Sequence, residues 1–406
     1  MAGADKLAFQ PDYAIAPGES LRELIETLGM SHKEMATRLE MTEQSLVRIL
    51  KGTQPITYDT SERLEMVTGT PASFWNNLEA LYREQLAKVA RHERLAADID
   101  WLNNIPLPVL RERGFLSKSR DKTEQLKEVL HFFGVSSVAA WRDIWETPAV
   151  AARRSACFES RTGHAAVWIR MGELQAAQIA CAPYEKTRFR EALARIRRLT
   201  RRSPGVFVEE MKRLCAEAGV ALALVPEIPK VPWNGATKWL TPTKAMILLN
   251  MQSETFMPAR VHSPQLGVSQ APLPAAGLVS ESNEIILPYG DSPWLAAGSF
   301  NLRGKKEDIF WFSFFHEAGH VLNDGKKGLY INDGTRADDR EKQADAFAAE
   351  ILIPAAHNNR IKAMRSRNEL LAVAEELDIS PGIVAGRFQF LTKKWDWFKD
   401  EISGLV

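Results

Sequence analysis

The feature that most constrains this sequence is a pair of histidines in a strongly apolar segment. Residues 309–320 read IFWFSFFHEAGH, and His316 and His320 are four positions apart. The apolar run suits a buried helix, and residues four apart lie on the same face of a helix. Both imidazoles can therefore bind one Zn²⁺. Glu317 is adjacent to the first histidine, so it can face the same cleft and accept a proton from a water that the ion activates.

A catalytic zinc site needs a third ligand, and the sequence offers candidates downstream. The stretch DDREKQADAFAAEILI (338–353), followed by a proline, predicts a second helix. Glu341 comes twenty-one residues after His320, which leaves enough chain to bring this helix back to the first. Two histidines and one glutamate form a known catalytic set with a fourth position open. Glu341 is preferred to Asp338 and Asp339, because it shares a helical face with Asp345, which can orient a ligand imidazole.

Five helices are expected in the N-terminal 95 residues. Their predicted ranges are 17–29, 31–39, 42–51, 58–67 and 71–89. Ser31 and Glu34 form a capping box, and the turn at 40–42 joins two short helices, which is the pattern of a helix-turn-helix domain. In this interpretation the 42–51 helix is the recognition helix. Its candidate DNA contacts are Thr42, Glu43, Gln44 and Ser45 at base edges, and Arg48 and Lys51 near phosphates.

The charge of this N-terminal region favours weak DNA binding by a monomer. Residues 1–91 contain ten Lys and Arg and thirteen Asp and Glu. Dimerisation could compensate for this negative balance. A small helical bundle used for protein contacts is the alternative interpretation.

The composition of the whole chain excludes several classes of protein. The chain has 406 residues, 52 basic and 51 acidic, so no global charge attracts it to nucleic acid or anionic lipid. No basic-then-apolar leader opens it, and no apolar run reaches the length of a membrane span. Three cysteines without CxxC spacing make a disulfide framework and a cysteine zinc site improbable. We therefore expect a cytoplasmic protein without membrane contact.

Two further segments allow more than one interpretation. Residues 186–202 contain eight basic side chains, which form either a phosphate-binding surface or, as we favour, a solvated helix face. Residues 368–391 resemble a second helix-turn-helix in pattern, and we expect them to be a packing element of the domain that contains His316 and His320, with Arg387 reaching the cleft. His262, Tyr289 and Tyr330 are candidate oxyanion donors, and the spacing does not choose among them.

The amino-acid sequence resembles known protein families over most of its length. FWFSFFHEAGHVLND, DREKQADAFAAEILIP and DISPGIVAGRFQ resemble the ImmA/IrrE metallopeptidases. ILKGTQPIT and GTPASFWNNLEALY are similar to the HigA-type antitoxins of the Xre repressor class. The first resemblance implies zinc ligands at His316, His320 and Glu341, with Glu317 as the catalytic base. The second implies a dimer that binds operator DNA.

The residue patterns and the resemblance together predict a multidomain protein with three parts. An all-α helix-turn-helix domain (1–95) and a helical middle region (96–205) precede an α+β zincin-like domain of the gluzincin type (206–406), with a small sheet beside the active-site helix. We interpret residues 251–298, approximately, as an insertion that forms a surface loop. The implied function is zinc-dependent cleavage of a partner repressor or antitoxin. The alternatives are a ligand-sensing transcription factor that cleaves nothing, and the antitoxin of a toxin–antitoxin pair.

Overall fold

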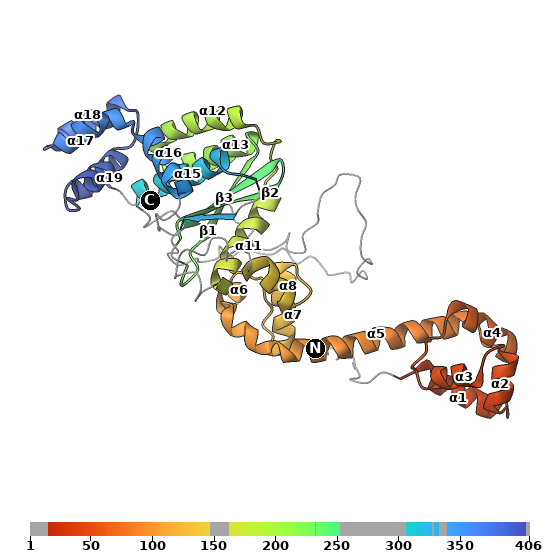
Figure 1. Ribbon diagram of the computed structural model, residues 1–406. Coiled ribbons are helices and arrows are strands. Elements are labelled where there is room, and N and C mark those ends of the chain that lie inside the picture. The colour runs from red at the N-terminus through yellow and green to blue at the C-terminus, as the bar shows by residue number, and fades with distance from the viewer. Residues whose placement is uncertain are drawn as a thin grey trace, which may run out of the picture. The chain divides into compact units, whose positions relative to one another are not determined.

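The computed structural model describes most of the chain, in two compact units (Figure 1). One unit comprises residues 1–100 and 121–126, and the other comprises 101–120 and 127–406. The described residues are 15–146, 162–231, 233–251, 306–326, 329–332 and 339–402, and of 329–332 only the backbone is described. The predicted insertion from residue 252 onward, His262, Tyr289 and the Tyr330 side chain therefore lie outside them.

The first unit contains the five predicted helices. They are α1 (Pro17–Thr27), α2 (His32–Arg38), α3 (Glu43–Leu50), α4 (Tyr58–Thr68) and α5 (Ala72–Ala97). The side chains of Ser31, Thr42 and Thr57 accept hydrogen bonds at the N-termini of α2, α3 and α4. Helix α5 extends to Ala97 rather than ending near residue 89, because no glycine or proline interrupts it.

Helices and one small sheet make up the remaining described chain. The helices are α6 (Leu107–Glu112), α7 (Lys122–Phe133), α8 (Val138–Trp141), α11 (Thr162–Gln178), α12 (Lys186–Arg198), α13 (Pro204–Glu217), α15 (Glu307–Asn323), α16 (Asp339–Leu352), α17 (Asn358–Ala363), α18 (Arg367–Glu376) and α19 (Pro381–Thr392). The strands are β1 (Val220–Pro226), β2 (Gly235–Thr241), β3 (Lys244–Met251) and β4 (Leu329–Asn332). Short 3₁₀ or π segments occupy 99–104, 142–146, 199–201, 355–357 and 399–401.

The sheet has the strand order β1-β3-β2-β4. Strands β1 and β3 are parallel, with Leu222 opposite Ile247, and β2 is antiparallel to both β3 and β4. Leu222 and Ile247 belong to the core that α13 and α15 complete. On the other face Leu248 contacts α11 so closely that a Cβ at Gly172 would lie 2.7 Å from it. Burial on both faces explains the continuous apolar sequence of β1 and β3.

The basic helix α12 has a structural role that neither interpretation of its charges anticipated. Arg197 is half-buried and donates from Nε to the carbonyl of Ile351 at 2.7 Å and from a terminal nitrogen to that of Leu352 at 3.1 Å. These carbonyls lie at the C-terminus of α16, where they have no partner within the helix. Most other basic residues of α12 are exposed, as expected of a solvated face. Arg197 thus anchors the helix that carries Glu341.

The C-terminal helices pack as predicted. Val373 of α18 and Phe388 of α19 are fully buried in the core that contains α15. Within the described residues, we find no helix that combines the length and the apolar character needed to cross a bilayer.

Candidate metal centre and DNA-binding helix

Helices α15 and α16 bring three candidate ligands together. His316 Nε2 lies 3.1 Å from His320 Nε2 and 3.1 Å from Glu341 Oε2, and His320 Nε2 lies 3.3 Å from Glu341 Oε1. Both histidines are buried. Gly319 permits this arrangement, because a Cβ there would lie 3.2 Å from the Cα of Ala344 on α16. The two helices therefore approach closely at the level of the site.

Each imidazole is oriented by a carboxylate on its other nitrogen. His316 Nδ1 lies 3.0 Å from Asp345 Oδ1, the residue expected from the sequence. His320 Nδ1 lies 2.5 Å from Asp324 Oδ2, and this partner was not predicted. Asp324 follows His320 by four residues at the end of α15, so the same helical spacing that links the histidines could have identified it. With both Nδ1 atoms engaged, both Nε2 atoms face the centre.

The donor set fits a divalent metal. Two ligand atoms about 2.05 Å from a tetrahedral zinc ion lie about 3.3 Å apart. The two Nε2 atoms are separated by 3.1 Å, and each lies 3.1 or 3.3 Å from a different oxygen of Glu341, which is close to that spacing. The three side chains place one donor atom each within 4.8 Å of one another. Of the competing ligands, Asp339 is exposed and paired with Lys342 at 2.9 Å, and Asp338 lies outside the described residues.

The pKa values of His316 and Glu341 are strongly shifted, because four carboxylates and two imidazoles lie close together at this site. Burial opposes charging of His316, but hydrogen bonds to Asp345 and Glu341 outweigh it and raise the His316 pKa to about 10. Burial also opposes ionisation of Glu341, yet hydrogen bonds from both histidines lower its pKa to about 2. Protonated imidazoles would balance the negative charge of the neighbouring carboxylates.

Glu317 is fully buried beside the ligands and has one unpartnered oxygen. The hydroxyl of Thr237 on β2 lies 2.8 Å from Glu317 Oε2 and donates a hydrogen bond to it. Glu317 Oε1 has no hydrogen-bond partner among the described residues. Burial raises the pKa of Glu317, while the histidines and Thr237 oppose this change. A buried carboxylate oxygen without a donor is typical of a group that awaits water or substrate.

Strand β2 contributes two residues that sequence reasoning missed. Thr237 fixes one oxygen of Glu317, and Gly235 leaves room for the other, because a Cβ at Gly235 would lie 2.6 Å from Glu317 Oε1. Both are about 80 residues before Glu317 in the chain, and no motif spacing links them to it. Only the packing of β2 against α15 reveals their position.

The second candidate site is α3 in the first unit. Glu40 has a left-handed backbone, with φ of 51°, which makes the turn before α3 tight. Thr42 accepts from the Ser45 amide at 3.2 Å and donates to the Ser45 hydroxyl at 3.0 Å, so its own hydroxyl caps the helix. Among the six predicted contacts Ser45 is half-buried, and the others are exposed: Thr42, Glu43, Gln44, Arg48 and Lys51.

Two protein-family models match the parts of the chain that contain these two candidate sites. Residues 304–389 match the peptidase family described as the IrrE N-terminal-like domain, and residues 21–75 match the helix-turn-helix family. The chain joins a helix-turn-helix domain to an IrrE-like peptidase domain. These matches support a DNA-binding regulator with a metallopeptidase-type domain. No curated protein and no solved structure gave a significant match, so the HigA-like subtype stays a prediction.

The peptidase match covers α15, α16 and most of α19. It therefore contains the three candidate ligands, Glu317 and Arg387. Thr237 lies outside the matched range, although its side chain contacts Glu317. The helix-turn-helix match covers α2, α3 and α4, and thus all six predicted DNA contacts.

Proposed function

We propose that the protein is a DNA-binding regulator whose zincin-like domain is a zinc-dependent endopeptidase that cleaves a protein partner, a repressor or an antitoxin. The observation that carries the proposal is the convergence of His316, His320 and Glu341 beside the buried, half-unpartnered carboxylate of Glu317. We further propose that it acts in the cytoplasm and binds its operator as a homodimer.

The three converging side chains would hold the metal ion. His316 and His320 would hold it through Nε2, and Glu341 would hold it through a carboxylate oxygen. A bound zinc ion supplies a Lewis acid that polarises the scissile carbonyl and lowers the pKa of water. Asp345 and Asp324 hold the imidazoles in the orientation that binding requires.

Glu317 then acts as the general base. Its Oε1 is the free acceptor, since Thr237 occupies Oε2. Burial raises the pKa of Glu317, which brings it closer to the working pH of a proton acceptor. After attack by water on the peptide carbonyl, Glu317 passes the proton to the leaving amine. The sequence predicted the roles of Glu317 and the ligands, and the geometry described above supports them.

Metal analysis and mapping of new protein N-termini test the peptidase together. We expect about one zinc per purified chain, lost in the His316→Ala variant and retained in Glu317→Gln. In cells, new N-termini should arise with the wild type and not with Glu317→Gln, because a general base contributes about 10²- to 10⁴-fold to the rate. Asp339→Asn is the control, since Asp339 is an exposed acid on α16 that faces Lys342.

The same cells distinguish the alternatives. If regulation of target genes is normal in Glu317→Gln and no cleavage occurs with the wild type, the protein is a non-proteolytic regulator. A chain that neutralises a small toxin without cleaving it would be an antitoxin instead. A wild-type chain without metal at the His316 site would contradict the peptidase proposal directly.

DNA binding is tested by the exposed face of α3. Gln44→Ala should relax base preference, because Gln44 is exposed at the first turn of the helix. Lys51→Ala should weaken binding about equally on all sequences and reduce its salt dependence. His32→Ala on α2, an exposed residue outside the proposed contacts, serves as the control. Equal binding by all variants would exclude α3 as the recognition helix.

A further inference from the structure

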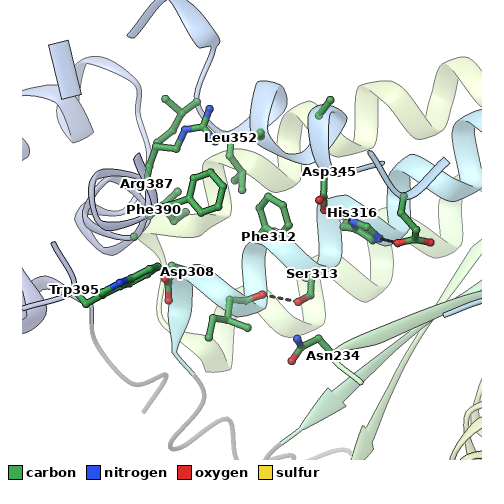
Figure 2. A pocket seen from close by; sticks show the side chains of 17 residues that line it. Asn234, Asp308, Phe312, Ser313, His316, Asp345, Leu352, Arg387, Phe390 and Trp395 are labelled. Atoms are coloured by element: carbon green, nitrogen blue, oxygen red, sulfur yellow. Dashed lines mark hydrogen bonds and ion pairs between the residues drawn. The ribbon is translucent and has the colours of Figure 1, made fainter. Parts of the chain in front are cut away.

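A cavity of about 550 Å³ adjoins the metal centre. It begins at His316 and Glu341 and extends between α15, α16 and α19 to Phe390 and Trp395. Figure 2 shows Asp345 and His316 at one end and Arg387, Phe390 and Trp395 toward the other. A volume of this size is typical of ligand pockets. The cavity therefore offers space for a substrate side chain next to the catalytic groups.

Its wall is mainly apolar, and part of that wall is exposed. Phe312, Leu352 and Ile383 line the interior. Phe390 at 38% and Trp395 at 59% are among the large hydrophobic residues that the described chain leaves exposed. Large apolar side chains at the mouth of a cavity commonly mark a binding site, because covering them with an apolar partner is favourable.

One cation in this wall forms no ion pair within the part of the chain that the structure describes. Arg387 lines the cavity and donates from Nε to Asn358 Oδ1 at 3.1 Å. Burial lowers its pKa, and the more distant Glu350 opposes this change. A half-buried guanidinium whose terminal nitrogens form no ion pair is stabilised by an anion that it can bind in a bidentate manner.

The only other charged group that lines this end of the cavity among the described residues is Asp308, whose carboxylate is largely enclosed. Asp308 has one oxygen packed where a Cβ of Gly386 would be, and its Oδ1 is enclosed and without a partner. Burial raises the pKa of Asp308, which favours its neutral form. Beyond the rim, Lys393 lies 4.4 Å from the centre of the Phe390 ring. The accessible charge at this end is therefore positive.

We propose that this cavity is the specificity pocket of the peptidase, and that it takes a large apolar substrate residue whose neighbouring carboxylate pairs with Arg387. The proposal rests on the proposed function, since it assigns a substrate to the same site. The carboxylate can come from an Asp or Glu side chain or from a chain terminus.

Peptide binding to the full-length Glu317→Gln protein tests the pocket without requiring turnover. The probes are fluorescein-labelled Gly/Ser octapeptides, amidated at the C-terminus, whose central pair is Leu-Glu, Leu-Gln, Leu-Lys or Ala-Glu. A fifth probe ends in Leu with a free carboxylate. Anisotropy should show Leu-Glu binding about tenfold tighter than Leu-Gln, the effect of one charge-assisted hydrogen bond.

Second substitutions in the Glu317→Gln protein show which residues are responsible for the peptide preferences. Arg387→Gln should remove the preference for Glu over Gln and leave Leu-Gln binding unchanged, and Arg387→Lys should restore part of it. Phe390→Ala should reduce the preference for Leu over Ala. Arg198→Gln, an exposed arginine on α12, is the matched control and should change neither ratio.

Each outcome decides the proposal. If the free-terminus probe alone depends on Arg387, the carboxylate is that of a chain end. The pocket assignment is wrong if Arg387→Gln leaves the ratio of Leu-Glu to Leu-Gln affinity unchanged from that of the Glu317→Gln protein. It is also wrong if no probe binds at millimolar concentration. If peptide binding depends on Arg387 but the protein cleaves nothing, the pocket assignment is supported and the peptidase proposal is rejected. If zinc-dependent cleavage occurs and does not depend on Arg387, the peptidase proposal is supported and the pocket assignment is rejected.

Discussion

The hydroxyl of Thr237 lies 2.8 Å from Glu317 Oε2, and this contact joins strand β2 to helix α15 at the centre of the candidate site. The same hydroxyl is 3.1 Å from the backbone carbonyl of Glu317. One side chain from the sheet thus sets the position of the carboxylate and leaves its other oxygen free. The arrangement predicts that the sheet tunes the chemistry of a residue that the helix supplies.

Thr237→Val keeps the side-chain shape and removes this hydrogen bond. We expect kcat to fall by about 10- to 100-fold, since a hydrogen bond to a charged group contributes about 1.5–3 kcal/mol. Loss of the donor raises the pKa of Glu317 further, so the acid limb of the kcat/KM profile should move to higher pH. Thr243→Val, in the exposed turn after β2, is the control. An unchanged pH profile would show that Thr237 has only a packing role.

Gly235→Ala places a methyl group against the free oxygen of Glu317. The added Cβ would lie 2.6 Å from Oε1, so the carboxylate must move from the position in which we propose that it accepts a proton. We expect loss of cleavage by at least about 10²-fold with zinc content retained. Gly205→Ala has no atom within 4 Å of its Cβ and should behave as the wild type. Full activity in Gly235→Ala would place the reacting oxygen elsewhere.

Asp324→Asn removes the charge that orients His320. Because such partners commonly change metal affinity by about 10- to 100-fold, zinc should bind more weakly by a similar factor. Competition with a fluorescent chelator measures the affinity, and Asp339→Asn on α16 is the matched control. Equal zinc affinity in Asp324→Asn and wild type would contradict the assigned role.

Metal binding should release protons. In the metal-free protein the His316 pKa is raised to about 10 from its ordinary value of 6.5, so near neutral pH this imidazole carries a proton that zinc must displace. Glu341, with its pKa lowered to about 2, is already ionised. The apparent zinc affinity should therefore rise as the pH is raised through neutrality. Calorimetry in two buffers of different ionisation enthalpy counts the protons, and a count of zero would contradict the prediction.

The sequence alone determined the parts of the site that depend on helical spacing. His316 and His320 share a face because a helix has 3.6 residues per turn, and Glu341 and Asp345 share one on α16 for the same reason. The capping residue Ser31 likewise marked the start of α2 in the N-terminal domain. These features are local, so a few neighbouring residues suffice to specify them.

Apart from the return of the helix that carries Glu341, which the sequence predicted, only the tertiary structure decided which distant segments complete the site. The approach of α16 at Gly319 brought Glu341 to the histidines, and the packing of β2 against α15 brought Thr237 and Gly235 to Glu317. Arg197 acquired a structural role because α12 lies at the C-terminus of α16. Such contacts depend on how apolar faces pack across the core, and that packing involves many residues far apart in the chain. The periodicity of apolar residues in the sequence identifies which side chains point inward. It does not determine which of these side chains contact one another in the folded protein.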